Sequence, residues 1–214
     1  MTTRTEEEQL ADIKDWWQRN GSPLLTGAAL ALVVVFGWKA WTKYQANQAQ
    51  GASILYQELV ESALTPSGKP DTARVAELAG KLTSEYGGTP YAQYGRLFVA
   101  KVAVDTGKLD DAVSELKAVV DKPADATLGE LARQRLARVL AAQGKAEEGL
   151  KLLDGAVDKA FVANREELKG DLLVQLKRTE EARAAYEKAK AALPEDAASG
   201  ALQVKLDDLA KGGA

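Results

Sequence analysis

The sequence predicts an all-α protein, with an N-terminal single transmembrane helix followed by an array of helical hairpins that forms an α-solenoid. The prediction rests on three observations. Residues 20–38 form an uncharged stretch of 19 residues, flanked by Arg19 and Lys39. All four tryptophans of the chain lie at the two ends of this stretch. After residue 41, apolar residues recur at three- and four-residue steps between polar turns, as expected for amphipathic helices.

The tryptophans bracket a stretch whose length matches one bilayer. Trp17 and Trp38 are 21 residues apart, which corresponds to ~31 Å along a helix and to the roughly 30 Å hydrocarbon layer. Tryptophan favours the membrane–water interface because its ring is apolar while its N–H needs a polar partner. We therefore predict membrane-interface roles for all four: Trp16, Trp17, Trp38 and Trp41.

Two other interpretations of residues 20–41 are a buried core helix and a cleaved signal peptide. A buried core helix needs neither charged residues at both ends of its apolar stretch nor pairs of tryptophans there. The segment before the apolar run is acidic, and no small-residue cleavage site follows the run. We interpret it as a retained signal anchor. Flanking positive charges nearly balance, although Arg4 and the terminal amine favour a cytoplasmic N-terminus.

Residues 5–19 are expected to form a short amphipathic helix at the membrane surface. Thr5 and Glu8 have the spacing of a capping box. Apolar side chains then fall on one side at helical spacing: Leu10, Ile13, Trp16 and Trp17.

Composition excludes several functional classes. The chain has 28 basic and 31 acidic side chains but no cysteine and no histidine. It therefore has no thiolate nucleophile, none of the His and Cys ligands that zinc and copper prefer, and no imidazole base. We expect no metal site, no cofactor and no catalytic residues. The balanced charge lacks the basic stripe of a nucleic-acid binder, so no nucleic-acid partner is expected.

Three later segments share one pattern: "DTGKLDDAVSELKAVVDKP", "AAQGKAEEGLKLLDGAVDK" and "VQLKRTEEARAAYEKAKAALP". Each has a polar turn, then two acids, then a small residue, namely Ala112, Gly149 or Ala182. A glycine in the turn can adopt the left-handed conformation that ends a helix, and acids suit the first turn of the next helix. The small residue allows that helix to approach its antiparallel partner closely.

A repeat of about 34 residues with these features resembles the tetratricopeptide repeat. Repeat-opening tryptophans are absent and the glycine of the third turn is replaced, so a generic helical-hairpin array remains the alternative. The expected organisation is a helix over 42–64, a loop at "TPSGKP" and a helix over 71–86. Hairpins follow at about 90–122, 127–159 and 161–193, with a capping helix over 196–210 that uses Leu202, Val204, Leu206 and Leu209.

Two groups of side chains are candidates for a peptide-binding groove. Tyr91 and Tyr94, followed by Phe98, open the first clear repeat at helical spacing, and their alternative role is core packing. Arg133 and Arg138, with Arg135 between them, form a basic group suited to an acidic peptide group, and their alternative role is solvation.

The order of these features resembles the YfgM family, the ancillary subunits of the bacterial SecYEG translocon. The most specific residues are Trp17, Asn20-Gly21, Gly37-Trp38 and Trp41. The resemblance implies a single-pass inner-membrane protein with a cytoplasmic amphipathic segment (1–19), a transmembrane helix (20–41) and a periplasmic tetratricopeptide-like domain (42–214). It also implies association with the SecYEG translocon and with a membrane-anchored periplasmic chaperone of the PpiD type, which resembles a prolyl isomerase. It implies no catalytic residues. A general cell-envelope scaffold for division or wall assembly is the alternative function, and an anchored hydrolase is a weaker one.

Overall fold

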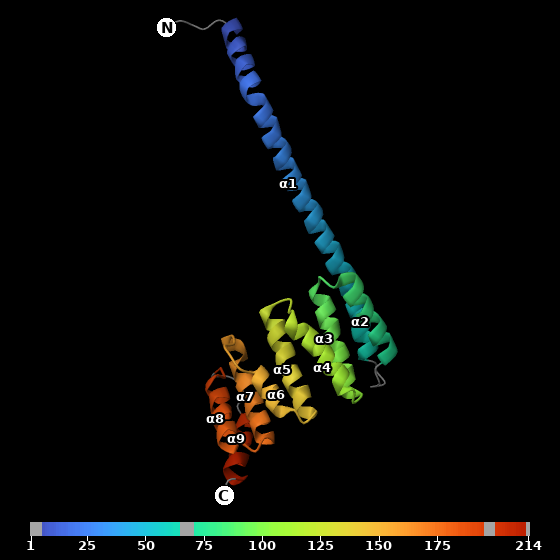
Figure 1. Ribbon diagram of the computed structural model, residues 1–214, viewed down its shortest axis with the longest axis vertical. Coiled ribbons are helices and arrows are strands. Elements are labelled where there is room, and N and C mark those ends of the chain that lie inside the picture. The colour runs from blue at the N-terminus through green and yellow to red at the C-terminus, as the bar shows by residue number, and fades with distance from the viewer. Residues whose placement is uncertain (1–5, 65–70, 195–199, 213–214) are drawn as a thin grey trace. The chain divides into compact units, whose positions relative to one another are not determined.

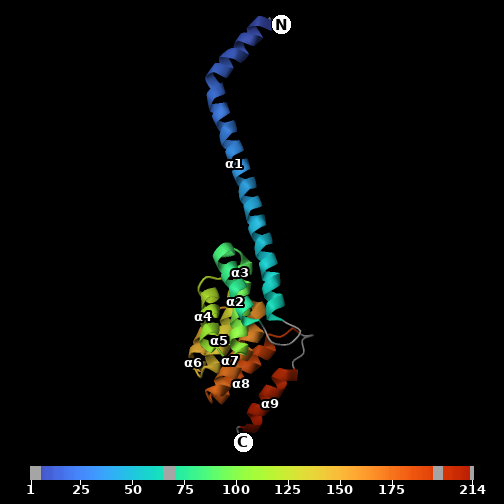
Figure 2. The same ribbon diagram turned by 90° about the vertical axis from the view of Figure 1, so that its right-hand side faces the viewer.

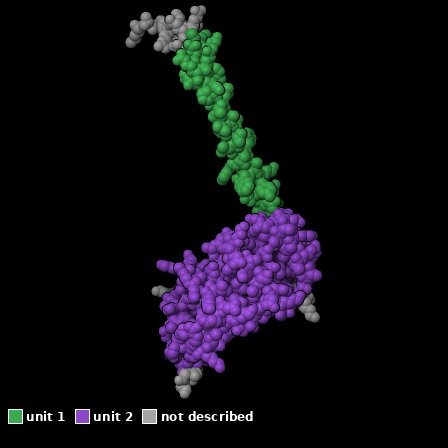
Figure 3. Space-filling model, viewed as in Figure 1, with its two compact units in different colours: residues 1–50 green, residues 51–214 purple. Residues whose placement is uncertain are grey.

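The computed structural model describes residues 6–64, 71–194 and 200–212, and these residues form helices joined by short turns (Figure 1). The chain divides into two compact units, Met1–Gln50 and Gly51–Ala214 (Figure 3). The expected Thr5 cap and the "TPSGKP" loop lie outside the described residues. The predicted all-α fold is confirmed.

The first unit is the N-terminal part of helix α1, which spans Glu6–Ala63 as a whole. The amphipathic segment and the apolar run form one continuous helix rather than two separate ones. Figure 2 shows α1 bent in its N-terminal part, and Pro23 lies inside the helix. Proline lacks the N–H that would bond to the Arg19 carbonyl, and its ring crowds that carbonyl, which explains the bend.

Among the described residues, α1 is the one helix long and apolar enough to cross a membrane. Its apolar side chains are open to the surroundings: Leu30 is 63% exposed and Val34 70% exposed. A buried core helix would hide such side chains against protein. The exposure therefore favours the predicted span over the core-helix interpretation.

The second unit continues through eight further helices in the described residues (Figure 1). Helices adjacent in sequence pack against one another, and α5 also packs against α7, as expected for stacked hairpins. Their bounds are α2 Thr72–Tyr86, α3 Pro90–Asp105, α4 Leu109–Asp121, α5 Ala126–Ala142, α6 Ala146–Leu152, α7 Lys159–Gln175, α8 Thr179–Ala191 and α9 Gly200–Gly212.

The three hairpin turns share one geometry. Gly107 and Gly144 have φ of 76° and 79°, and Lys177 occupies the third turn with φ of 59°. In each turn the next amide bonds back to a carbonyl five residues earlier, for example Lys108 N to Ala103 O at 2.8 Å. These are Schellman caps, so the third turn keeps the left-handed conformation without the glycine that favours it.

The small residues allow close helix packing as predicted. Ala112 and Ala182 are fully buried. A Cβ at Gly149 would lie 2.7 Å from the carbonyl oxygen of Ala137, so α6 approaches the backbone of α5 too closely for any side chain there. The acid pairs occupy the first turns of α4, α6 and α8, also as predicted.

Two expectations at the C-terminal side were wrong in detail. The second hairpin was expected to extend over about 127–159, but its second helix, α6, ends at Leu152. Gly155, with φ of 89°, prevents its continuation, and Asp158 caps the start of α7. In α9, Leu202 is buried as expected of a cap, whereas Val204 is 59% exposed and does not cover the open end.

Candidate peptide-binding groove

Two adjoining hollows open between α3 and α5 in the second unit, with volumes of about 320 and 250 Å³. They share Leu97, Lys101 and Arg135, so together they form one groove, which we call the α3/α5 groove. Its remaining lining is Tyr56, Tyr94, Phe98, Ala100, Val104, Asp105, Leu116, Leu131, Arg138 and Val139.

One end of the groove is aromatic. The Tyr56 ring, from the end of α1, has its centroid 5.9 Å from that of Tyr94 and 5.8 Å from that of Phe98. The Tyr91 ring packs against Tyr56 at a tilt, with centroids 5.7 Å apart, and belongs to the same cluster without lining the hollow. The rings pack on one another, as the core-packing interpretation expects, and Tyr56 and Tyr94 also line the hollow, so a peptide-facing role stays a prediction. Burial raises the pKa of the Tyr56 phenol, with the neighbouring Tyr94 adding to the effect.

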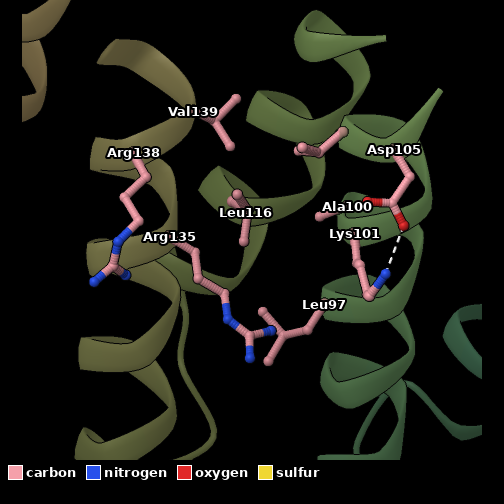
Figure 4. Close-up of a pocket in the computed structure, with 9 residues that line it drawn as sticks. Leu97, Ala100, Lys101, Asp105, Leu116, Arg135, Arg138 and Val139 are labelled. Atoms are coloured by element: carbon pink, nitrogen blue, oxygen red, sulfur yellow. Dashed lines mark hydrogen bonds and ion pairs between the residues drawn. The ribbon is translucent and has the colours of Figure 1, made fainter. Parts of the chain in front are cut away.

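The other end of the groove is basic and apolar. Figure 4 shows Arg135 reaching from α5 toward Leu97, with Arg138 one turn further along α5. On the α3 wall, Lys101 and Asp105 form an ion pair of 2.5 Å. Burial and the positive charge of Arg138 lower the pKa of the Arg135 guanidinium. A lowered pKa means that the environment disfavours the positive charge of the Arg135 side chain.

Arg133 does not join this group. It points to the opposite side of α5, where Nη1 donates to Glu130 Oε2 at 3.1 Å beside a separate hollow between α5 and α7. A helix turns by about 100° per residue, so Arg133 and Arg135 face about 160° apart, whereas Arg135 and Arg138 share a face. Of the four residues predicted for the groove, Tyr94 lines one hollow and Arg138 lines the adjoining one, whereas Tyr91 and Arg133 line neither.

A buried ion pair that the sequence did not reveal lies under Arg133. Glu130 and Arg165 are 4% and 1% exposed, and the Arg165 guanidinium binds both oxygens of Glu130. Arg165 Nη1 also donates to the Gly155 carbonyl at 3.0 Å. Burial alone would raise the pKa of Glu130, but hydrogen bonds from Arg165 and Gln134 outweigh it and lower the pKa. Glu130 is the one carboxylate buried this deeply among the described residues, and it serves as an anchor between α5 and α7.

The tryptophans of α1 are all half exposed or more, between 52% and 69%. The Trp17 ring lies over Gly21, where an added Cβ would be 3.1 Å from the ring. The Asn20 side chain donates to the Trp16 carbonyl at 3.0 Å. The missing side chain of Gly21 thus leaves room for the Trp17 ring, whereas Asn20 bonds only to the main chain of Trp16. Trp41 packs on Tyr44 with ring centroids 6.4 Å apart.

These features define a class: a helical-repeat protein with one candidate membrane anchor and a groove in its repeat domain. In the part of the chain that the structure describes, no group of three acidic, histidine or cysteine side chains could hold a metal ion. Residues 14–211 match the family described as tetratricopeptide repeat-like domain.

Three relatives described as "Ancillary SecYEG translocon subunit" narrow the class further. The Escherichia coli (strain K12) protein is 29% identical over 204 residues, covering 95% of this chain and 96% of the relative. The Neisseria gonorrhoeae protein is 32% identical over 208 residues, covering 95% and 97%. The Haemophilus influenzae protein is 27% identical over 169 residues, covering 79% and 80%. The chain belongs to the family of ancillary SecYEG translocon subunits with a tetratricopeptide-like domain, and the resemblance to the YfgM family is confirmed.

Proposed function

We propose that this protein is a single-pass inner-membrane subunit that associates with the SecYEG translocon and presents its repeat domain in the periplasm. The proposal is supported chiefly by the extent of the similarity, because the E. coli relative covers 95% of the chain and so includes both the apolar helix and the repeats. The exposed apolar face of α1 and its flanking tryptophans suit a lipid environment. The relatives' names suit a protein that acts by binding rather than by catalysis.

The anchor's role is to raise local concentration. A repeat domain held beside a channel by one span meets its partners as if in a single molecule, so that weak contacts suffice. We propose that the partner in the periplasm is a membrane-anchored chaperone of the PpiD type, and that together they assist proteins leaving the channel. The α3/α5 groove offers a surface on which such a partner's segment can dock.

The test is co-purification of the full chain from membranes in mild detergent, with identification of the bound proteins. We expect translocon subunits together with a membrane-anchored chaperone. A version without residues 1–43, exported with a cleavable signal, should lose the translocon although circular dichroism shows it still helical. Unaltered co-purification of that version would contradict the tethering. Recovery of wall-synthesis or division proteins instead would favour the envelope scaffold.

A matched variant separates tethering from specific contacts of the span. Replacing residues 20–41 with an unrelated transmembrane sequence keeps the domain on the membrane. Retained co-purification would mean that tethering is sufficient, and loss would mean that the span itself contacts the translocon. In both cases the chain must stay in the membrane fraction for the comparison to count.

The orientation can be tested directly because the chain contains no cysteine. A single cysteine replaces either Thr3, before the apolar run, or Lys117, an exposed residue of α4. A membrane-impermeant maleimide added to cells with a permeabilised outer membrane should label Lys117→Cys and spare Thr3→Cys. Labelling of Thr3→Cys without labelling of Lys117→Cys would show the opposite orientation.

A further inference from the structure

We propose that the α3/α5 groove recognises a short acidic segment in which an apolar side chain stands next to one or two carboxylates. This inference deepens the proposed function, on which it rests, by stating what the groove selects. It follows from two independent properties of the lining: two uncompensated arginines, and an apolar surface left open beside them.

The first property is charge without a partner. Five other arginines of the second unit are paired with carboxylates: Arg74 with Glu58 and Glu77, Arg96 with Glu115, Arg133 and Arg165 with Glu130, and Arg178 with Glu147 and Glu181. Among the described residues Arg183 in α8 makes no ion pair either, but it lies outside the α3/α5 groove. In the described residues no ion pair includes Arg135 or Arg138, which lie three residues apart on one face of α5. Like charges at this spacing repel each other. An external carboxylate placed between them would relieve that repulsion and accept charge-assisted hydrogen bonds from both.

The groove's own acid does not fill this role. Asp105 lines the hollow from α3, but its carboxylate is held by Lys101 at 2.5 Å. Figure 4 shows this pair on the α3 wall, separate from the arginines on α5. The wall that faces the arginines is thus neutral and the α5 side is positive, so charge complementarity selects an acidic occupant.

The second property is apolar surface. Val104 is 41% exposed and Leu131 36% exposed, and both line the groove together with Leu97 and the ring of Phe98. The two hollows lie near the lower end of the range of about 300–1,000 Å³ that ligand pockets occupy. That space suits one or two large side chains of a peptide. A peptide with carboxylates alone would leave this apolar surface exposed to water. We therefore infer that an apolar residue stands next to the acidic groups of the peptide.

The test uses the full chain in detergent micelles and a fluorescein-labelled peptide, Gly-Ser-Gly-Leu-Phe-Asp-Glu-Leu-Gly-Ser-Gly. Fluorescence anisotropy measures its binding, with empty micelles as the blank. Two further peptides are its controls: one carries Asn-Gln in place of Asp-Glu, and the other carries Ser-Ser in place of Leu-Phe. We expect saturable binding of the first peptide and at least tenfold weaker binding of both controls, and this comparison needs no protein variant. Equal affinity for the first peptide and its amide version would overturn the inference.

Protein variants then locate the site. Arg135→Gln and Arg138→Gln should each weaken binding about tenfold, the effect of losing one charge-assisted hydrogen bond. Lys117→Gln removes the same charge from an exposed position of α4 that does not line the groove, and it should leave the affinity unchanged. Val104→Ser should weaken binding of the acidic peptide although it alters no charge. An equal effect of Lys117→Gln would mean that net charge, not the groove, attracts the peptide, and would overturn the inference.

Self-association and failure of the larger proposal give different results. If a second copy of the chain occupies the groove, sedimentation will show a dimer that Arg135→Gln disrupts and that the peptide dissociates. That result would overturn the inference that the groove binds a segment of another protein. Absent peptide binding with intact translocon co-purification would refute this inference alone. Peptide binding without translocon co-purification would refute the proposed function alone.

Discussion

Gly170→Ala should strongly destabilise the C-terminal end of the repeat array, although the same substitution usually stabilises a helix. Gly170 lies inside α7, where alanine is favoured over glycine by about 0.5–1 kcal/mol. However, a Cβ at this position would overlap the ring of Tyr186, with even its Cζ only 2.9 Å away. Tyr186 is 3% exposed and cannot move without leaving the core.

The magnitude follows from what the ring loses. Displacing Tyr186 gives up the burial of a large side chain, about 2–3 kcal/mol. It also breaks the hydrogen bond from the Tyr186 hydroxyl to Asp171, 2.8 Å long, which contributes about 1.5–3 kcal/mol because the acceptor is charged. After subtraction of the helix-propensity gain, we expect the free energy of unfolding to fall by about 3–5 kcal/mol.

The displacement should also loosen α9. Lys205 in that helix lies 5.5 Å from the Tyr186 ring centroid and binds Glu167 and Asp171 at 2.7 and 2.6 Å. Moving the ring would disturb this cluster. Hydrogen exchange followed by mass spectrometry should therefore show faster exchange in α7 to α9 than in α3 to α5.

The assay is urea unfolding of the full chain in micelles, followed by far-ultraviolet circular dichroism. Gly80→Ala in α2 is the matched control, because nothing lies within 4 Å of its added Cβ, and it should stabilise by about 0.5–1 kcal/mol. In a Tyr186→Leu background the cost of Gly170→Ala should largely disappear. A Gly170→Ala protein as stable as the wild type would refute the packing argument.

Four further predictions concern the buried ion pair, the dependence of stability on pH, the turn backbone and the membrane. Arg165→Met should cost about 3–5 kcal/mol because Glu130 is left charged and buried, and Glu130→Leu in the same chain should restore most of it. The pKa of Glu130 is lower in the folded than in the unfolded protein, so its ionised carboxylate stabilises the fold. This contribution is complete above the unfolded carboxyl's pKa of about 4.3 and is lost as the pH falls towards the folded pKa. In this acidic range the free energy of unfolding of Glu130→Gln should therefore depend less on pH than that of the wild type. Lys177→Gly should raise the free energy of unfolding by about 0.5–1 kcal/mol, measured in urea, whereas Gly144→Ala should lower it. In vesicles, tryptophan fluorescence should be quenched more by lipids brominated near the headgroup than by lipids brominated at the chain end; the reverse order would place the rings inside the hydrocarbon.

Local signals were sufficient to predict most of the secondary structure. Helix ends depend on caps within a few residues, so the glycines at 107 and 144 and the acid pairs after them located three hairpins. Lys177 shows the limit of such signals, because a lysine does not indicate a left-handed residue. There the surrounding Schellman hydrogen bonds impose the conformation.

The candidate site was predicted only in part. Helical rotation, available from the sequence, would have separated Arg133 from Arg135 and Arg138. Nothing local indicated that Tyr56, near the end of the first long helix, lines the same groove as residues of α3 and α5. That contact depends on how the helices stack.

The sequence alone therefore determined the elements whose physics is local: an apolar helix as long as a bilayer is thick, and amphipathic helices joined by capped turns. Only the tertiary structure decided which side chains meet. Glu130 and Arg165 are 35 residues apart, and Tyr186 enters the space left by Gly170 from another helix. Such pairs depend on the distance and rotation between helices. Those quantities are set by the fit of many side chains at once, and no short stretch of sequence contains them.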